Sequence, residues 1–591
     1  MDKHMFMTGG LYLFYLISTY CSFTYQNKSI KEIIFLVLYP VFELILLYLL
    51  SKYCSSVKKS YYKLFLILID SVLHMIVICQ FIYFFLSGEY ITLLALENIN
   101  QVYVVLNWFH IVIFILIILF IVKFAKSTYC EYFFLNIKSV AVPIVLCSFV
   151  VLIQNGVFFN SHKYSKYIFG TALGSFFETT YYYFSNNAYV ANNVRTNINS
   201  YVNKEKVFKS ILPFQSSEDF IDKPNIIILF TEGTSSRLLG CYGGKYKLLT
   251  PNIDDFSNHS MKVVNYFNHT AATFRGTHGQ LASCYPFKGG YGNGQWADKN
   301  NKEEYMKRSY QTLPNVLNKL GYDTYFLSPH KNKDPYTNLL HMLKFKKVYV
   351  AEDYNRLFSF SGEMYHDSVR DIDMYKSLKS LMEGMTNSSP FLICMYTLNT
   401  HAFMDTYEDG IKYKIKNSVL NTLHNLDYCF GNFWNWFKES KYSKDTIIIF
   451  TADHTHYYEK PYVELMDVEK DYKKFFIDKI PLIIYDPIHN LPKEYDGCGK
   501  TSLDLTPSIL HLLNVNHIKN SFLGSSIFDE RSKHELNIAA LGNDFYYIMD
   551  NEVYRYNELR KNGHIREIID KKVDLIKDYY ALEEINDVFK E

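Results

Sequence analysis

Long apolar runs dominate the first 160 residues of the chain, and a mixture of polar and apolar positions follows them. A bilayer core of about 30 Å is crossed by roughly 20 mostly apolar residues in a helix. The first stretch could also be a signal peptide, but it lacks a small-x-small cleavage site and four more stretches follow it. The pattern therefore predicts five membrane-spanning helices, at Gly9–Phe23, Ile33–Leu50, Tyr61–Leu86, Val102–Phe124 and Val140–Phe158.

The lysines between these stretches predict an orientation, because short cytoplasmic loops carry an excess of Lys and Arg. The second and fourth loops are rich in lysine, whereas the third, Ser87–Gln101, has two Glu and neither Lys nor Arg. Lys28 and Lys31 in the first loop weakly oppose this assignment. On balance we expect a cytoplasmic N-terminus, with everything after Phe159 outside the cytoplasm.

Four ionisable residues fall within the predicted spans, where charge is costly: Glu43, Asp70, His74 and His110. Asp70 and His74 are four residues apart and share a helix face. The simpler interpretation is a polar pair buried between helices, and the alternative is a contact for a lipid headgroup. Because the stretches show no repeat and no pair broken by Gly or Pro, they look like an anchor rather than a transporter.

The rest of the chain divides at residue 224. Residues 161–223 mix aromatic clusters with Asn, Ser and Lys, which predicts an amphipathic juxtamembrane linker. From residue 224 short apolar runs alternate with helical patterns, which is typical of an α/β sheet covered on both faces. Strands are predicted at Asn225–Phe230, Asp323–Leu327, Pro390–Tyr396, Thr446–Phe450, Pro481–Tyr485 and Asn537–Leu541. Helices are predicted at Thr312–Leu320, Asp371–Met385, Val419–Phe437 and Ser502–Leu513.

The predicted organisation is thus a transmembrane domain at 1–160, the linker at 161–223 and an extracytoplasmic catalytic domain at 224–591. A net charge of +2 gives no electrostatic reason to expect nucleic acid as a partner. The catalytic part has an odd number of cysteines, which argues against a disulfide framework. Cys241 with Cys284 remains a candidate bridge.

Two predicted strands end in ionisable residues. The run Asn225–Glu232 is aliphatic until its final carboxylate, and Thr446–His454 ends in Asp453 and His454. Buried charges are expensive unless they are paired or bind a metal, and these side chains suit Zn²⁺ or Mn²⁺. A carboxylate that caps the following helix is the commoner explanation for either one alone. Their matching positions favour one divalent metal ion, held by Glu232, Asp453 and His454.

Several hydroxyl groups lie beside an Arg and a His between Asn268 and His278. A nucleophile bound to a catalytic metal loses its proton more easily, and small residues around Thr273 would let a phosphate approach. Without the metal ligands, a polar surface loop would be the better interpretation.

Taken in order, these motifs resemble the alkaline-phosphatase superfamily, and within it the membrane-bound sulfatase-like transferases. That group contains lipoteichoic acid synthases, phosphoglycerol transferases and phosphoethanolamine transferases. The resemblance covers Asn225 to about Asp529, and a sulfatase-like α/β domain after five spans is also the layout of the group. It rests on Glu232, Thr250–Asn252, Thr273 and Asp453–His454, with further matches at Gly321–Thr324, Lys479–Pro487 and Ser502–Leu510.

The resemblance implies roles for individual residues. Glu232, Asp453 and His454 would be metal ligands, and Thr273 would be the fourth ligand and the nucleophile, with Thr277 as the fallback. His401 matches the strand-end histidine that binds substrate in the group. Weaker candidates for substrate binding are His330, Arg275 and His456, because the loop from Ser328 to Tyr336 departs from the synthase pattern.

The expected reaction is transfer of a phospholipid headgroup, phosphoethanolamine or phosphoglycerol, through a phospho-threonine. The donor would be a membrane phospholipid and the acceptor an envelope glycan or glycolipid, at the bacterial inner (plasma) membrane, with the protein a monomer. No Cys/Ser-x-Pro-Ser-Arg segment, which sulfatases need to make formylglycine, precedes the expected position. Two alternatives stay open: a hydrolase of sulfate or phosphate esters on the same scaffold, and a non-catalytic anchored scaffold or sensor.

Overall fold

The computed structural model describes the chain in segments. They are residues 12–13, 40–41, 43–53, 60–87, 90–91, 171–185, 204–205, 223–286, 311–357, 363–385, 389–466, 469, 471–515, 519–529, 537–542, 544–556 and 563–585. The chain forms two compact units. The first contains Met1–Tyr189 and Tyr458–Glu469, and the second contains Val190–Tyr457 and Lys470–Glu591.

An eight-stranded sheet organises the second unit, in the order β11-β3-β10-β9-β2-β8-β4-β5. Its strands are β2 (Asn225–Thr231), β3 (Met261–Val264), β4 (Asp323–Leu327), β5 (Lys347–Tyr349), β8 (Phe391–Thr397), β9 (Thr446–Ala452), β10 (Leu482–Tyr485) and β11 (Glu494–Asp496). The central strands β9, β2, β8 and β4 are parallel, and β10 runs antiparallel to both of its neighbours. Because β2 and β8 are buried along nearly their whole length, both faces of the sheet must be covered.

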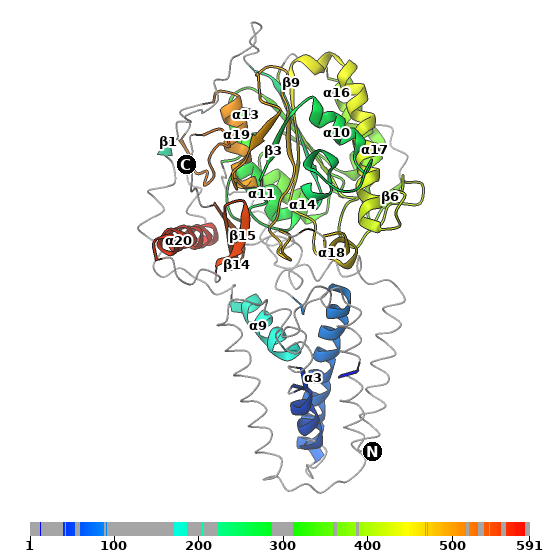
Figure 1. The fold of residues 1–591 in the computed structure, drawn as a ribbon, viewed down its shortest axis with the longest axis vertical. Coiled ribbons are helices and arrows are strands. Elements are labelled where there is room, and N and C mark those ends of the chain that lie inside the picture. The colour runs from blue at the N-terminus through cyan, green and yellow to red at the C-terminus, as the bar shows by residue number, and fades with distance from the viewer. Residues whose placement is uncertain are drawn as a thin grey trace. The chain divides into compact units, whose positions relative to one another are not determined.

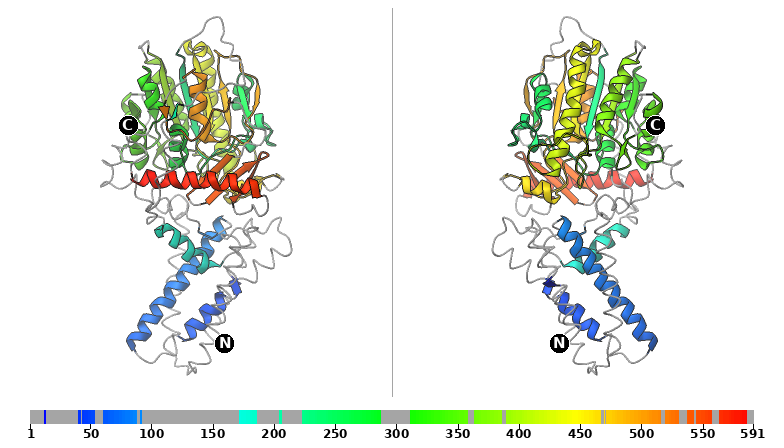
Figure 2. Two further views of the ribbon diagram at one scale, coloured as in Figure 1. Left: turned by 90° about the vertical axis from the view of Figure 1, so that its left-hand side faces the viewer. Right: turned by 90° about the vertical axis from the view of Figure 1, so that its right-hand side faces the viewer.

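Helices cover the two faces, as the alternating pattern predicts (Figures 1 and 2). One layer holds α10 (Pro251–Asn258), α16 (Asp371–Glu383) and α17 (Ser418–Glu439). The other holds α11 (Thr273–Ala282), α13 (Leu313–Lys319), α14 (Pro335–Met342) and α19 (Leu505–Leu512), which follows the short helix η8 (Ser502–Asp504). Within each layer the helices contact one another and the sheet.

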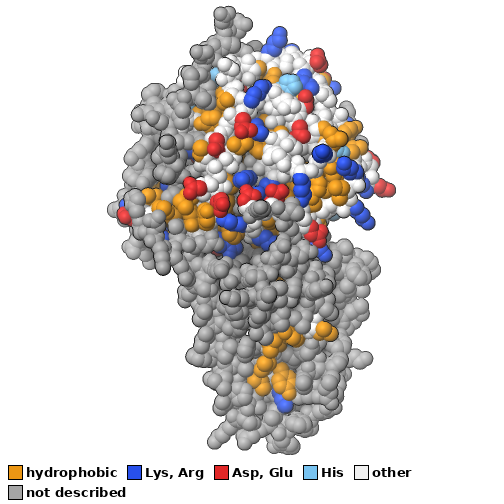
Figure 3. Space-filling view, in the orientation of Figure 1, with side chains coloured by type: hydrophobic (Ala, Val, Ile, Leu, Met, Phe, Trp, Pro, Cys, Tyr) orange, Lys and Arg blue, Asp and Glu red, His pale blue; other side chains and the backbone are white. Residues whose placement is uncertain are grey.

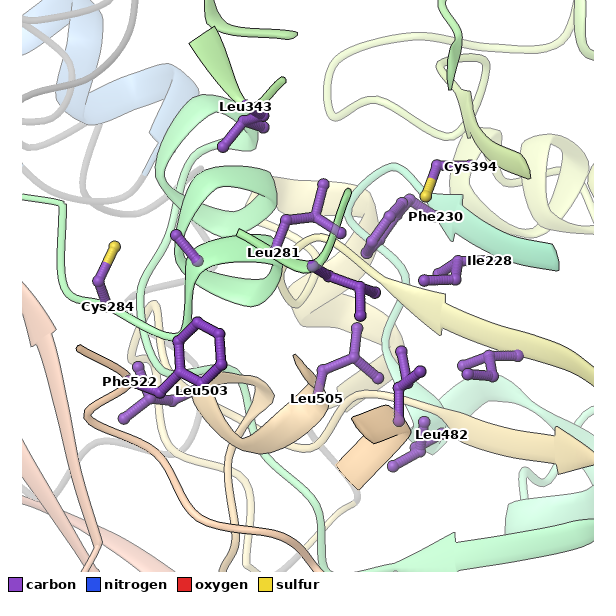
Figure 4. Close-up of a cluster of buried hydrophobic side chains, with 14 of the residues drawn as sticks. Ile228, Phe230, Leu281, Cys284, Leu343, Cys394, Leu482, Leu503, Leu505 and Phe522 are labelled. Atoms are coloured by element: carbon purple, nitrogen blue, oxygen red, sulfur yellow. The ribbon is translucent and has the colours of Figure 1, made fainter. Parts of the chain in front are cut away.

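The main apolar core lies between the sheet and the layer that contains α11. Ile228 and Phe230 of β2 and Cys394 of β8 face Leu281 of α11 across this core (Figure 4). Side chains alternate between the faces of a strand, so Glu232 and Tyr396 lie on the same face as Phe230 and Cys394. The α11 layer therefore covers the face on which the strand-end residues of the predicted site lie.

Smaller elements complete the second unit. A three-stranded antiparallel sheet contains β13 (Asn537–Leu541), β14 (Asp544–Met549) and β15 (Glu552–Arg555), and the long helix α20 is Gly563–Ile585. Two small antiparallel sheets have two strands each: β1 (Lys204–Glu205) with β12 (Lys519–Asn520), and β6 (Met364–Tyr365) with β7 (Ser368–Val369). The remaining helices are η5 (Ser236–Leu238), η6 (Gly240–Tyr242), α15 (Ala351–Leu357) and η7 (Lys441–Lys444).

Besides short strands that were not predicted, two features of the second unit differ from the expectations. Asn537–Leu541 forms a strand as predicted, but it pairs with β14 in the separate sheet, because its partner is the next segment of the chain. Cys241 and Cys284 are both free thiols, so the candidate bridge between them is not formed.

The described part of the first unit contains α3 (Ser60–Ser87), α9 (Ala172–Ser185), α18 (Lys460–Met466) and helical residues 43–53. Helix α3 coincides with the third predicted span, while the spans at Val102–Phe124 and Val140–Phe158, with His110, lie outside the described residues. Only residues 12–13 of the first predicted span are described. Among the described residues, no helix combines the length and the apolar character that crossing a membrane requires.

Polar groups link the helices of this unit. Asp70 on α3 accepts hydrogen bonds from Ser51 Oγ at 2.8 and 2.9 Å, and His74 Nδ1 lies 2.8 Å from the Asp70 carbonyl oxygen. Glu43 accepts from the backbone N–H groups of Ala172 and Leu173, at the start of α9. All three ionisable side chains are buried. This is the arrangement of polar residues buried between helices, which was the simpler of the two interpretations of Asp70 and His74.

Candidate metal centre and nucleophile

The ends of three neighbouring parallel strands bring the predicted site together. Thr231 of β2 is paired with Ala452 of β9 on one side and with Thr397 of β8 on the other. Glu232 and Asp453 therefore leave the sheet at the same level, at the carboxyl edge where ligands of such sheets bind. The register alone places these two carboxylates next to each other, although they are far apart in sequence.

Glu232, Asp453 and His454 each direct one potential ligand atom to a common point, and these atoms lie within 4.8 Å of one another. His454 Nε2 is 3.3 Å from Glu232 Oε1 and 3.5 Å from Asp453 Oδ2. All three side chains are buried. Asp453 Oδ1 accepts from the backbone N–H groups of Gly233 and His454, at 2.9 and 2.8 Å. In contrast, Asp453 Oδ2 and His454 Nε2 are buried with no hydrogen-bond partner.

The charges of Glu232, Asp453 and His454 favour a bound cation. Burial and the charge of Glu232 both raise the pKa of Asp453. Burial also opposes ionisation of Glu232, but His454, His401 and Tyr396 together outweigh it and hold the pKa of Glu232 below its usual range. Burial lowers the pKa of His454, yet the two carboxylates raise it further than burial lowers it. Within the trio, the one positive charge that can balance the two carboxylates is that of protonated His454.

These residues fit a divalent metal ion. Two carboxylates and one imidazole form the mixed oxygen and nitrogen ligand set that Zn²⁺ and Mn²⁺ accept. The buried atoms without hydrogen bonds, Asp453 Oδ2 and His454 Nε2, are the ones that converge. A hydrogen bond fixes the other end of the His454 ring, whose Nδ1 donates to the carbonyl oxygen of Thr455 at 2.6 Å. Such a bond orients a metal-binding imidazole.

Thr273 lies beside the trio at the start of α11. Its hydroxyl donates to Glu232 Oε2 at 2.9 Å. The preceding residue, Ala272, has a positive φ of 71°, an unusual backbone conformation for alanine. Gly276, one turn into the helix, packs so closely against the carbonyl oxygen of Asp453 that a Cβ atom there would collide with it. The sharp turn and the close helix contact together bring the Thr273 hydroxyl to the metal ligands.

The other two threonines of the segment lie differently. Thr277, the fallback nucleophile, is buried, and its hydroxyl is 2.9 Å from that of Tyr336. Thr270 is also buried, on the loop before α11. Of these threonines, Thr273 is the one whose hydroxyl bonds to Glu232, and it is also the half-buried one.

The predicted substrate-binding residues surround the site at different depths. His401 is half-buried and donates through Nδ1 to the carbonyl oxygen of Ala402 at 2.8 Å, and its charge lowers the pKa of Glu232. The ring of His330 stacks on that of Tyr396, with centroids 6.0 Å apart, and burial lowers its pKa. His456 donates through Nδ1 to the carbonyl oxygen of Gly233 at 3.0 Å, and so supports the loop after Glu232. Arg275 is buried within α11.

Tyr396, which was not predicted as a site residue, is central to this arrangement. Its hydroxyl donates to Glu232 Oε2 and lies 3.4 Å from Thr273 Oγ1. Thr400 also contributes, because its hydroxyl donates to the Glu232 carbonyl oxygen at 2.6 Å. The signal was present in the sequence as a tyrosine near the end of an otherwise apolar buried strand.

Comparison with known families agrees with this geometry. The model of the family described as "Sulfatase" matches residues 224–515. We call this segment the sulfatase domain, after the family whose model it matches. The matched range contains Glu232, Thr273, Asp453 and His454, and it ends before the three-stranded sheet and α20.

Several solved structures resemble the chain at low sequence identity. A protein of the alkaline phosphatase superfamily from Vibrio parahaemolyticus is 18% identical, with a TM-score of 0.50 over 66% of this chain and 95% of its own. The lipoteichoic acid synthase LtaP from Listeria monocytogenes is 16% identical, with a TM-score of 0.45 over 64% of this chain and 95% of its own. A sulfatase from a glycosaminoglycan-metabolism locus of Bacteroides thetaiotaomicron is 14% identical, with a TM-score of 0.44 over 62% of this chain and 100% of its own. Such distant likeness bears on the fold alone.

Proposed function

We propose that this protein transfers a phospholipid headgroup, phosphoethanolamine or phosphoglycerol, to an envelope glycan or glycolipid through a covalent phospho-threonine at Thr273. The observation that carries the proposal is the hydroxyl of Thr273, held 2.9 Å from Glu232 Oε2 beside the three convergent ligands. A threonine at this position is an ordinary alcohol nucleophile. It needs only to lose a proton, whereas the sulfatase nucleophile requires prior conversion to formylglycine.

The residues of the site divide the chemistry between them. Glu232, Asp453 and His454 would hold the divalent ion, which supplies charge neutralisation and lowers the pKa of a neighbouring hydroxyl. With its pKa lowered in this way, the Thr273 hydroxyl would give its proton to water, and its oxygen forms the new bond to phosphorus as the bond to the diacylglycerol oxygen breaks. Because α11 begins at Thr273, the backbone N–H groups of its first turn would be available to the phosphoryl oxygens of the adduct.

A proton donor is needed for the departing diacylglycerol oxygen, and His401 is our first choice. Because its Nδ1 donates to the Ala402 carbonyl oxygen, the protonated ring has Nε2–H available for the leaving group. In the second half of the reaction an acceptor hydroxyl gives its proton to the same histidine and its oxygen bonds to phosphorus, while the bond from phosphorus to Thr273 Oγ1 breaks and frees Thr273 for the next cycle. Two easier displacements thus replace one difficult displacement.

Membrane anchorage is part of this proposal. The five apolar stretches before residue 160 would tether the sulfatase domain to the bacterial plasma membrane on its extracytoplasmic side. A tethered enzyme suits a donor that cannot leave the bilayer. The same tether explains why the predicted spans and the sulfatase domain belong to one chain. We propose that this chain acts as a monomer.

The direct test is a search for the covalent intermediate. The full chain is incubated with bacterial phospholipids and its peptides are analysed by mass spectrometry. We expect an adduct on Thr273 whose mass names the headgroup. The matched variants are Thr273→Ala, which should abolish both adduct and transfer, and Thr277→Ala, which should retain both. Transfer that survived both substitutions would exclude a covalent threonine mechanism.

A hydrolase is the second candidate, because the matching family is the sulfatase family. The same residues would then release a phosphate or sulfate ester to water. The two functions separate in one assay, which follows the fate of labelled headgroup with a glycan or glycolipid acceptor present. Label on the acceptor supports the transferase, whereas label that appears only in solution supports the hydrolase.

A further inference from the structure

The second unit has one surface on which exposed apolar side chains gather. Five large apolar side chains are exposed among the described residues of this unit, and four of them are Leu248, Ile411, Ile415 and Tyr428. Leu248 is 73% exposed and the other three are 39–45% exposed. Single exposed apolar residues are ordinary, but such a concentration is a sign of an interaction surface.

Hydrogen bonds show that these residues belong to one continuous surface. The Tyr413 hydroxyl donates to the Lys247 carbonyl oxygen at 2.8 Å, which joins loop 411–416 to loop 245–249. Asn425 of α17 accepts from the backbone N–H of Ile411 at 3.0 Å, and His424 Nδ1 donates to the Leu249 carbonyl oxygen at 2.7 Å. Tyr428 lies one turn beyond His424 on the same helix. We call this surface the loop patch.

Lysines alternate with the apolar residues of the loop patch. Both loops contain the sequence Lys-Tyr-Lys, and five lysines are exposed: Lys245, Lys247, Lys412, Lys414 and Lys416. Figure 3 shows basic side chains, Lys or Arg, beside apolar side chains at the right-hand edge of the described surface, where Figure 1 places α17. Positive charge and apolar area therefore occupy the same surface.

Three nearby acids, against five exposed lysines, offset only part of this charge. Asp409 pairs with Arg370 at 3.3 Å, and Asp405 accepts from the Asn421 side chain at 2.9 Å. Glu408 is exposed beside the patch. Lys412, Lys414 and Lys416 form no ion pair with any residue that the structure describes. The excess positive charge is thus available to an anionic partner.

We propose that the loop patch docks on a bilayer surface that contains anionic phospholipid. Lysine heads attract lipid phosphates, while leucine, isoleucine and tyrosine side chains enter the interface between headgroups and acyl chains. A hydrophilic anionic polymer would use the lysines but gives no reason for four apolar side chains to face water. The dock would be a contact of the sulfatase-domain unit itself, in addition to the anchorage proposed for the N-terminal stretches, and it does not depend on the reaction that Thr273 performs.

Amide hydrogen exchange of the full chain with lipid nanodiscs tests this proposal. Exchange in residues 245–249 and 411–416 is compared between nanodiscs of phosphatidylcholine alone and nanodiscs that also contain phosphatidylglycerol. We expect exchange to slow by about tenfold with the anionic lipid, and to return at high salt. Equal exchange in the two lipids would overturn the proposal.

Matched variants separate docking from general charge effects. The triple variant K412Q/K414Q/K416Q should lose the protection, and the control K319Q/K441Q/K444Q, with three exposed lysines elsewhere, should keep it. The pair L248S/I415S should also lose it, because insertion needs the apolar side chains. Protection that survived in either patch variant would contradict the proposal. Protection by soluble polyphosphate, with none from phosphatidylglycerol, would instead identify a polymer-binding surface and overturn the lipid assignment.

Discussion

Asp427 and Asp453 are equally buried carboxyl groups of the same unit, but they differ in what their oxygens contact. Both oxygens of Asp427 are hydrogen-bonded: it accepts from the backbone N–H groups of Asn252 and Ile253, at 3.0 and 2.8 Å, and from the Asn252 side chain at 2.8 Å. It thereby caps α10 from the neighbouring helix α17. In Asp453 one oxygen is saturated by backbone donors, and the other faces Glu232 and His454 without a hydrogen bond.

The difference separates a structural carboxylate from a candidate ligand. Asp371, at the start of α16, shows that one bare oxygen is not sufficient evidence, since its Oδ2 is also buried without a hydrogen-bond partner. Asp371 accepts from the N–H groups of Leu398 and Asn399, and burial raises its pKa to about 7. The convergence of three residues, rather than the burial of one, distinguishes Asp453.

The same substitution at the two sites should have opposite consequences. Asp453→Asn should reduce transfer by at least about a thousandfold, because it removes a ligand charge at the reacting centre. Asp427→Asn should leave transfer within a few-fold and cost about 1 kcal/mol of unfolding free energy, since an amide still accepts from the α10 N–H groups. Rate assays and urea unfolding measure the two effects. Comparable activity loss in both variants would remove the distinction.

Tyr396 extends the comparison to a residue that contacts Glu232, a candidate metal ligand, and is not itself a candidate ligand. Tyr396→Phe should slow formation of the Thr273 adduct by about 10- to 100-fold while metal content stays unchanged, because the hydroxyl positions Glu232 and Thr273. The control is Tyr336→Phe, which removes the bond to Thr277 and should change the rate little. Adduct formation is followed across pH, where a shifted profile in Tyr396→Phe alone would indicate positioning of the nucleophile. An unchanged rate and profile would show that Tyr396 has no such role.

The last prediction concerns Asp371, the third carboxyl group of the comparison. Because the folded-state pKa of Asp371 is about 7, the folded chain keeps a proton that the unfolded chain has lost above about pH 4. Stability should therefore fall as the pH rises from about 4 to about 7, by at most about 1.4 kcal/mol per pH unit, with no further change above that range. Asp371→Asn should flatten this dependence. Urea unfolding followed by fluorescence would show it, and parallel curves for the two proteins would contradict it.

Much of the sulfatase domain could be predicted from local patterns. The strands β2 and β9 are long aliphatic runs that must be buried, and their carboxylate ends stand out for that reason. The edge strands β5 and β11 were not predicted, because they are three residues long and largely half-buried or exposed, which leaves no apolar signature. The pairing of β13 in a separate sheet depends on tertiary contacts that a single strand pattern does not contain.

The site was predictable only in part for a similar reason. Glu232, Asp453 and His454 follow visible strands, so their type and position suggested a common edge. The contact of Tyr396 with Glu232 depends on the strand order β9-β2-β8, which no local pattern specifies. The turn at Ala272 could not be predicted either, because nothing in the sequence of a polar loop indicates that a small residue has a positive φ.

The central claim is that Glu232, Asp453 and His454 bind one divalent ion, and elemental analysis of the purified full chain tests it most directly. Wild-type protein and Asp427→Asn should each carry about one Zn²⁺ or Mn²⁺ per chain, and Asp453→Asn should carry nearly none. A wild-type chain without a divalent ion after exposure to both metals, or an Asp453→Asn variant that kept a full equivalent, would contradict the account.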